Sequence, residues 1–213
     1  LKNEFSSITA EYEMKMNPIS TSSGVYNWAA ADKIVAYGNA NGINVHGHAL
    51  VWHVAVPDWL TNFSGTDAEF AAEVKKYITD VVTHYAGKVK SWDVVNEAVE
   101  DDGSWRKSPW YNIMGEDFIA KAFHMAHEVD PKAHLIYNDY NTETPAKRDF
   151  IVNMVKKFKK QSVPIHGVGM QEHIGIDTPS IEEIDKTLTM LADIGVRAHI
   201  TELDIDVLPS VWN

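Results

Sequence analysis

Two glutamates at the ends of apolar segments are the most informative feature of this chain. Residues 92–97 read Trp-Asp-Val-Val-Asn-Glu and residues 199–204 read His-Ile-Thr-Glu-Leu-Asp, which places Glu97 and Glu202 at the ends of predicted buried strands. A desolvated carboxylate is unfavourable unless it is paired or hydrogen-bonded. Two of them in one repeating architecture indicate the acid and the nucleophile of a glycosidase. The alternative is that both glutamates are structural and cap helices or form salt bridges.

Composition narrows the classes of partner. The chain has 213 residues, of which 45% are hydrophobic and 23% are charged, as in an ordinary soluble globular domain. Its formal net charge of −11 argues against binding to nucleic acid or to an anionic membrane surface. A neutral polymer or a small molecule is compatible with this charge.

The residue types exclude several other chemistries. The chain contains no cysteine, which excludes disulfides, thiolate zinc sites and cysteine nucleophiles. No stretch approaches the roughly 18 apolar residues of a membrane span. Residues 1–4 open directly into domain-like sequence without a signal peptide, but an internal segment of a secreted protein would lack one too.

Short apolar runs alternate with longer segments of helical periodicity. Strands are predicted at residues 13–16, 43–50, 90–96, 134–138, 167–171 and 198–202. Helices are predicted at about residues 29–40, 67–86, 116–129, 146–160 and 180–194. The last of these helices opens on a capping-box pattern at Ser180 and ends before Gly195, a predicted C-cap.

Repeated strand–helix units predict a parallel sheet, in either a doubly wound fold or a barrel. A doubly wound nucleotide-binding domain would carry a glycine-rich loop after its first strand, and the sequence has none. Polar residues instead cluster at the predicted strand ends, as they do in barrel enzymes. We therefore expect an α/β fold, a (β/α)8 TIM barrel with about six of its eight units visible.

The six predicted strands also define the expected domain. Residues 1–213 are expected to form a single catalytic barrel domain, as an incomplete segment that lacks the first and last strands. An open barrel exposes unpaired strand edges. We therefore expect this segment to be poorly stable as an isolated polypeptide.

Five motifs follow one another in an order that is highly specific. They are Gly-His-Ala-Leu-Val-Trp-His at 47–53, Trp-Asp-Val-Val-Asn-Glu at 92–97, Tyr-Asn-Asp-Tyr-Asn at 137–141, Gln-Glu-His at 171–173 and Ile-Thr-Glu-Leu-Asp at 200–204. This set of motifs resembles family 10 of the glycoside hydrolases, the retaining endo-β-1,4-xylanases, over almost the whole chain.

The resemblance implies a catalytic pair, in which Glu97 is the general acid/base and Glu202 is the nucleophile. A retaining enzyme needs such a pair about 5–5.5 Å apart. By the same resemblance, His173 and Asp204 orient the nucleophile. The other substrate-binding residues that it implies are Glu11, Lys15, His48, Trp52, Asn96, Tyr140, Asn141 and Gln171, together with His173.

Two positions depart from the family pattern on the glycone side of the cleft. The segment at residues 11–15 matches at Glu11 and Lys15, but Tyr12 stands where the family has asparagine. Ala55 stands where many members carry glutamine. Both departures remove amide groups, so Tyr12 either stacks on a sugar or partly blocks the subsite.

Two other functions are compatible with parts of the sequence. His46 and His48 share one face of a strand and, with His53, His173 and Asp204, suit a metal-dependent barrel hydrolase. This hypothesis leaves Glu97 and Glu202 unexplained. A barrel that binds glycan without cleaving it is the other alternative, although both carboxylates are present.

The resemblance also implies the partners and the location. Xylan and xylo-oligosaccharides are the expected partners, without nucleic acid, membrane span, cofactor or metal. The protein is expected to be secreted or otherwise extracytoplasmic.

Overall fold

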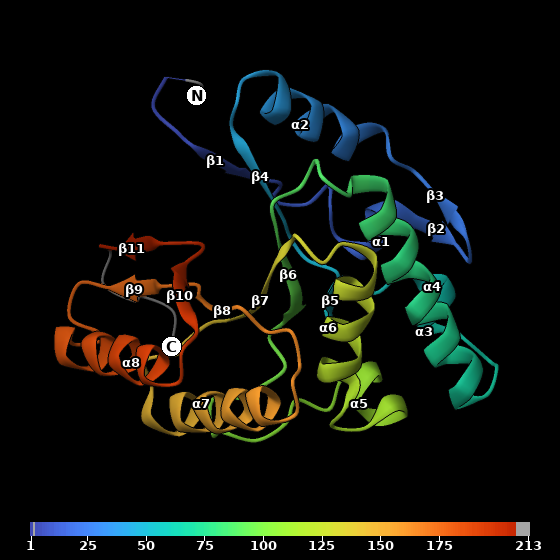
Figure 1. Ribbon diagram of the computed structural model, residues 1–213. Coiled ribbons are helices and arrows are strands. Elements are labelled where there is room, and N and C mark those ends of the chain that lie inside the picture. The colour runs from blue at the N-terminus through green and yellow to red at the C-terminus, as the bar shows by residue number, and fades with distance from the viewer. Residues whose placement is uncertain (2, 208–213) are drawn as a thin grey trace.

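The fold is built on one curled parallel sheet with helices along its outer side (Figure 1). The computed structural model describes residue 1 and residues 3–207. The sheet consists of β1 (Ser7–Thr9), β4 (Asn44–Gly47), β5 (Val51–Trp52), β6 (Ser91–Asn96), β7 (His134–Asp139), β8 (Gly167–Met170) and β10 (Arg197–Ile200).

The strand order identifies the architecture. Strands follow one another across the sheet in the order β1-β4-β6-β7-β8-β10, and β5 pairs with β6 beyond the end of β4. Every pairing in this sheet is parallel. A doubly wound sheet reverses its strand order at a switch point, whereas a barrel adds each strand beside the previous one. The predicted (β/α) barrel is therefore confirmed as a partial barrel.

The main helices connect successive strands and pack on the sheet. They are α2 (Ala29–Ala40), α4 (Asp67–Tyr85), α6 (Phe118–Val129), α7 (Pro145–Lys160) and α8 (Ile181–Asp193), and they confirm the five predicted helices. Three shorter helices lie in the connecting loops: α1 (Met16–Ile19), α3 (Asp58–Thr61) and α5 (Pro109–Met114). No helix among the described residues is both long and apolar enough to cross a membrane.

The helix ends follow from local chemistry. Thr66 and Glu69 form a capping box at the start of α4, in which each side chain accepts from the other residue's backbone N–H. At α8 the Ser180 hydroxyl accepts from the Glu183 N–H, and Gly195 follows the helix with a φ of +69°. The predicted cap signals of α8 therefore lie at its ends.

The core lies between the sheet and its helices, and β6 runs through its centre. Trp92, Val94 and Val95 of this strand are buried. The Trp92 ring packs against Gly47 of β4, where an added Cβ would lie 2.1 Å from a ring carbon. Only glycine admits this close approach, so Gly47 allows β4 to lie beside β6 with these two residues paired.

The predicted first strand at residues 13–16 is wrong. This segment forms a turn that leads into α1, and the first strand is Ser7–Thr9. Met14 and Met16 are buried, but Met14 lies in the turn and Met16 is the first residue of α1, so their burial reflects packing on the core rather than a strand. The true strand contains a single large apolar residue, Ile8, which periodicity cannot distinguish from a loop.

Two small sheets flank the main one. β2 (Ser20–Ser22) and β3 (Val25–Tyr26) form an antiparallel hairpin before α2. β9 (His173–Gly175) and β11 (Asp204–Asp206) pair in parallel beyond the ends of β8 and β10. Their register sets His173 directly opposite Asp204.

Candidate active site

A pocket of about 370 Å³ opens where the strands end. Side chains and backbone from β1, β4, β6 and the segments after β8 and β10 line it. The lining residues are Thr9, Ala10, Glu11, Lys15, His46, His48, Asp93, His173, Thr201 and Glu202.

Glu97 directly follows β6 and is held by amide groups. Its backbone adopts a φ of +56°, which is uncommon for a residue with a side chain. Its N–H donates to the Asn138 carbonyl at 2.9 Å. Its Oε1 accepts from Asn96 Nδ2 and Gln171 Nε2, both at 3.1 Å. The carboxyl group is therefore fixed by neutral donors, and these donors come from two strand ends.

Glu202 follows β10 and has a more open surrounding. Its Oε1 accepts from Asn138 Nδ2 at 2.9 Å, and its Oε2 lies 3.4 Å from His173 Nε2. About a third of its side chain (32%) is exposed. The carboxylate thus meets an amide on one side and an imidazole on the other.

Asn138 joins the two glutamates and was not singled out by the sequence analysis. Its fully buried amide donates both to Asn96 Oδ1 and to Glu202 Oε1 at 2.9 Å, and its oxygen accepts from Thr201 Oγ1 at 2.7 Å. The Cβ of any side chain at Gly169 would lie 2.1 Å from this oxygen. A continuous chain of amides therefore connects Glu97 to Glu202.

A signal for Asn138 existed in the strand register. Asn96, Asn138 and Gly169 occupy paired positions on β6, β7 and β8, so they form one layer of the barrel. The motifs contain Asn96 and Asn138, but the register that aligns these two residues with Gly169 becomes visible only in the folded sheet.

His173 bridges two carboxylates. Its Nδ1 lies 2.7 Å from Asp204 Oδ2, while its Nε2 faces Glu202. Burial acts to lower the pKa of His173, but the hydrogen bond and charge of Asp204, together with the charge of Glu202, raise it above its usual value. A protonated His173 can donate to both carboxylates.

His46 and His48 both contact Asp93, a buried residue of β6 that the sequence analysis did not select. His46 Nε2 and His48 Nδ1 lie 2.8 and 2.9 Å from Asp93 Oδ2. Burial acts to raise the pKa of Asp93, yet the two imidazoles hold it well below the usual range. The same carboxylate raises the pKa of His46 against the effect of burial.

This pairing bears on the metal-site hypothesis. The strand does place His46 and His48 on one face, as predicted, but both imidazoles are directed to Asp93. Across the described residues, no group of three or more histidine, aspartate or glutamate side chains is arranged to hold a metal ion. The arrangement gives no support to a metal-dependent hydrolase.

Lys15 is the centre of the segment that the resemblance assigns to the glycone side. Lys15 Nζ sits 4.7 Å from the centroid of the Trp52 ring and 6.0 Å from that of Tyr12. Tyr12 is 53% exposed, and its hydroxyl accepts from Asn17 Nδ2 at 3.2 Å. Ala55, in contrast, is buried. Glu11 and Lys15 line the pocket, whereas Tyr12, Trp52 and Ala55 are not among its lining residues.

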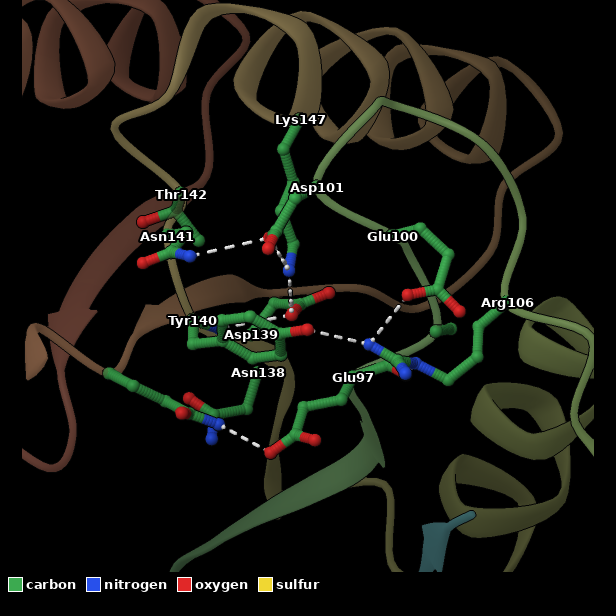
Figure 2. A network of polar contacts seen from close by, with 12 residues as sticks. Glu97, Glu100, Asp101, Arg106, Asn138, Asp139, Tyr140, Asn141, Thr142 and Lys147 are labelled. Carbon is green, nitrogen blue, oxygen red and sulfur yellow. Dashed lines mark hydrogen bonds and ion pairs between the residues drawn. The ribbon is translucent and has the colours of Figure 1, made fainter. Parts of the chain in front are cut away.

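Tyr140 and Asn141 follow β7 and do not line this pocket. Figure 2 shows them in a network that joins the loop after β6 to the loop after β7. Arg106 Nη2 donates to the Tyr140 hydroxyl at 2.7 Å, and Asn141 Nδ2 donates to Asp101 Oδ1 at 3.3 Å. Lys147 Nζ lies 3.4 Å from the centroid of the Tyr140 ring.

A buried ion pair packs against Tyr140 of this network. Lys147 and Asp139 are both fully buried, with Nζ and Oδ1 2.9 Å apart. Asp139 also accepts from the Tyr137 hydroxyl at 2.5 Å and from the Tyr140 N–H at 2.9 Å. Burial raises the pKa of Asp139 to about 6, against the opposing effects of Lys147 and these donors.

Comparisons with known proteins agree with this geometry. The family model of glycosyl hydrolase family 10 matches residues 1–212. The β-1,4-xylanase of Dictyoglomus thermophilum is 46% identical over 209 residues, which cover 97% of this chain and 59% of that protein.

Solved structures show the same similarity. An endoxylanase of family 10 retrieved from a sugarcane soil metagenome is 61% identical with a TM-score of 0.95, over 100% of this chain and 63% of that one. Xylanase 10B of Thermotoga petrophila, solved with xylobiose, is 41% identical with a TM-score of 0.93, over 96% and 63%. The chain thus spans between 59% and 63% of the length of these relatives.

Proposed function

Since the chain belongs to glycosyl hydrolase family 10, we propose that it carries the catalytic residues of an endo-β-1,4-xylanase that acts with retention. The observation that carries this proposal is the pair of strand-end carboxylates, Glu97 and Glu202, joined through the buried amide of Asn138. Such a pair matches the requirement of glycoside hydrolysis for an acid and a base or nucleophile.

The first half of the proposed reaction forms a covalent intermediate. Glu97 donates its proton to the leaving glycosidic oxygen while the Glu202 carboxylate attacks the anomeric carbon. The amides of Asn96 and Gln171 both donate to Oε1 of Glu97 and fix the orientation of its carboxyl group. The imidazole of His173, held between Glu202 and Asp204, favours the ionised nucleophile.

The second half hydrolyses the intermediate. Glu97, now ionised, accepts a proton from a water molecule that attacks the anomeric carbon and releases Glu202. We expect the two carboxyl groups to lie about 5–5.5 Å apart in the enzyme with bound sugar. We propose that Asn96, next to the acid, binds the sugar 2-hydroxyl in the transition state.

The remaining residues divide between the two sides of the scissile bond. We assign Glu11, Lys15, His48 and Trp52 to the glycone side, because Glu11, Lys15 and His48 line the pocket and Trp52 packs under Lys15. Tyr140 and Asn141 are assigned to the leaving-group side, because they contact Arg106 and Asp101 of the loop that follows Glu97. Aromatic faces suit the apolar C–H surfaces of pyranose rings.

Xylan and xylo-oligosaccharides are the proposed substrates. The support comes from relatives such as the Thermotoga petrophila xylanase 10B, whose structure contains xylobiose, and the xylanase 10C of Cellvibrio japonicus, of which a variant was solved with xylopentaose. We also propose that the protein acts outside the cytoplasm, where a polymer of this size is accessible.

Product analysis on the full-length protein tests this function. Incubation with xylohexaose should give internal cleavage products, and NMR should detect the β-anomer first at the new reducing end. The matched control is Glu202→Gln, which keeps the size of the side chain and removes the nucleophile. First appearance of the α-anomer would indicate inversion, and binding without cleavage would favour the glycan-binding alternative.

A further inference from the structure

Arg106 lies in the loop after β6 and folds back onto the residue that ends this strand. Its backbone N–H donates to the Ala98 carbonyl at 2.9 Å, and its Nε donates to the Glu97 carbonyl at 2.9 Å. Only 18% of the side chain is exposed. The guanidinium therefore holds the backbone of Glu97, whose left-handed conformation has an intrinsic cost.

The other end of the same guanidinium reaches the opposite loop. Arg106 Nη2 donates to the Tyr140 hydroxyl at 2.7 Å and lies 3.1 Å from Glu100 Oε2 (Figure 2). A planar guanidinium carries several N–H donors in a fixed fork, so one side chain can tie two groups together at a set spacing. Arg106 thus links the Glu97 backbone to a residue on the leaving-group side.

The choice of the carbonyl as acceptor has a chemical consequence. A guanidinium placed on a carboxyl group lowers its pKa, and the group would then fail to carry a proton at neutral pH. Within the part of the chain that the structure describes, the ion pair of Arg106 is with Glu100, whereas its contact with Glu97 is through the backbone. Position is thereby fixed without a direct cationic contact to the carboxyl group.

We propose that Arg106 is a positioning residue for the general acid/base: it sets Glu97 and Tyr140 relative to each other, while Glu100 balances its charge. The proposal rests on the role of Glu97 given above and extends it to a residue that contacts no reacting atom. Removing Arg106 should therefore impair the cleavage of bonds that need protonation and leaving-group contacts, and should spare bonds that need neither.

The charged groups around Arg106 define the expected pH effect. Glu100 and Tyr140 contact it directly, Asp139 lies nearby on β7, and His53 faces it from the segment after β5. Burial and the charge of Arg106 both lower the pKa of His53, whereas Glu97 and Glu100 oppose them. Removing the Glu100 charge leaves the guanidinium unbalanced and should favour the ionised form of the acid/base.

The first test compares two substrates in the full-length enzyme. Arg106→Gln should lower kcat/KM on xylotriose by about 10²-fold, the scale expected when a catalytic group is misplaced by about 1 Å. On dinitrophenyl xylobioside, whose leaving group needs little protonation, kcat/KM should fall by less than about threefold. Arg106→Lys should not restore kcat/KM on xylotriose, because an ammonium group cannot reach both the Glu97 carbonyl and the Tyr140 hydroxyl. Lys107→Gln, the same charge change on an exposed neighbour, should leave both values unchanged.

The second test uses the pH profile, which a purely structural role would not move. In Glu100→Gln the alkaline limb of kcat/KM on xylotriose should shift to lower pH. In the double variant with Arg106→Gln the limb should return toward its original position. This test does not require Arg106→Gln alone to fold well, since the shift in Glu100→Gln is itself a required result.

The outcomes separate this proposal from the proposed function. If the wild type fails to cleave xylohexaose, the function itself is wrong. If kcat/KM of Glu97→Ala falls equally on both substrates, the role of Glu97 on which this proposal rests is wrong. The positioning role is overturned if the wild type and Glu97→Ala behave as expected, but kcat/KM of Arg106→Gln falls equally on both substrates or falls on neither. An unshifted pH limb in Glu100→Gln overturns it as well.

Discussion

The surroundings of Glu97 and Glu202 differ in both burial and kind of contact. Around Glu97, the amide donors Asn96 and Gln171 are each only 3% exposed, and the supporting Asp139–Lys147 pair is fully buried. Around Glu202, the side chains of His173 and Asp204 are 43% and 65% exposed. The donors to Glu97 are thus two buried amides, whereas Glu202 meets one buried amide, from Asn138, and an imidazole at an accessible rim.

This difference matches the two proposed tasks. An acid/base must carry a proton and then release it, so its neighbours should hold it in place without fixing its charge. A nucleophile must stay ionised, so an imidazole shared with Asp204 suits it. The contrast is therefore between the neutral amides of Asn96 and Gln171 around Glu97 and the ionisable imidazole of His173 beside Glu202.

Removing the accessible carboxylate should have the largest effect. Glu202→Ala should lower kcat by roughly 10⁴-fold or more on xylan and on aryl xylosides alike, since no other group can form the covalent intermediate. Steady-state kinetics on both substrates measures this. Recovery of activity with retained stereochemistry in Glu202→Ala would contradict its assignment as the nucleophile.

Removing the packed carboxylate should have an effect that depends on the leaving group. Glu97→Ala should lower kcat/KM on xylan by about 10²–10⁴-fold, the usual contribution of general acid catalysis. On dinitrophenyl xylobioside, kcat/KM should fall far less, because its leaving group departs without a proton. Equal losses on the two substrates would argue that Glu97 and Glu202 do not divide their roles in this way.

The ion pair under the acid/base side should matter for stability. Lys147→Met leaves the fully buried Asp139 without its cation, and we expect a loss of about 3–5 kcal/mol in the free energy of unfolding. Urea denaturation of the full-length protein measures the change. The matched control is Lys157→Met, whose half-exposed pair with Glu116 spans 3.9 Å and should contribute within about 0.5 kcal/mol. Similar values for the two variants would remove the contrast in burial as an explanation.

The glycone side offers a smaller test. Each amide that Tyr12 and Ala55 replace would contribute up to about 1–1.5 kcal/mol in hydrogen bonding to sugar hydroxyls. Tyr12→Asn combined with Ala55→Gln should therefore raise kcat/KM on short xylo-oligosaccharides by about tenfold. Tyr12→Asn alone is the control, because Ala55 is buried and the longer side chain must find room. No gain in the double variant would indicate that Tyr12 already contacts the sugar.

The rim histidine should give the smallest effect, with a defined sign. The pKa of His173 is raised in the folded protein, so its contribution to stability is complete below the unfolded pKa of about 6.5 and disappears as the pH rises through the folded pKa. Because the site is exposed, we expect at most about 1 kcal/mol. The difference in Tm between the wild type and His173→Gln should be largest near pH 6 and should shrink at alkaline pH. A difference that grows with pH would contradict the ion-pair explanation.

Much of the fold could be predicted from local patterns. The helices around Val74 and Val155 carry clear 3.6-residue periodicity and cap signals, and α2, α4, α6, α7 and α8 lie where expected. The prediction of the first strand was wrong, because Ser7–Thr9 contains one apolar residue, whereas the buried Met14 lies in a turn and the buried Met16 begins α1. Short strands are held by their neighbours, which a local pattern does not contain.

For the site, the sequence determined which residue types stand at the strand ends: Glu97, Glu202, His48 and His173 were all identifiable from motifs. Tertiary structure alone decided which of them meet. Asn138 and Asp93 connect groups that are far apart in the chain, because parallel strands bring their carboxyl ends to one edge of the sheet. Arg106 reaches Tyr140 across two loops. Whether a hydrogen bond forms depends on differences of a few tenths of an ångström in the donor–acceptor distance, and only the register of the folded sheet sets these distances.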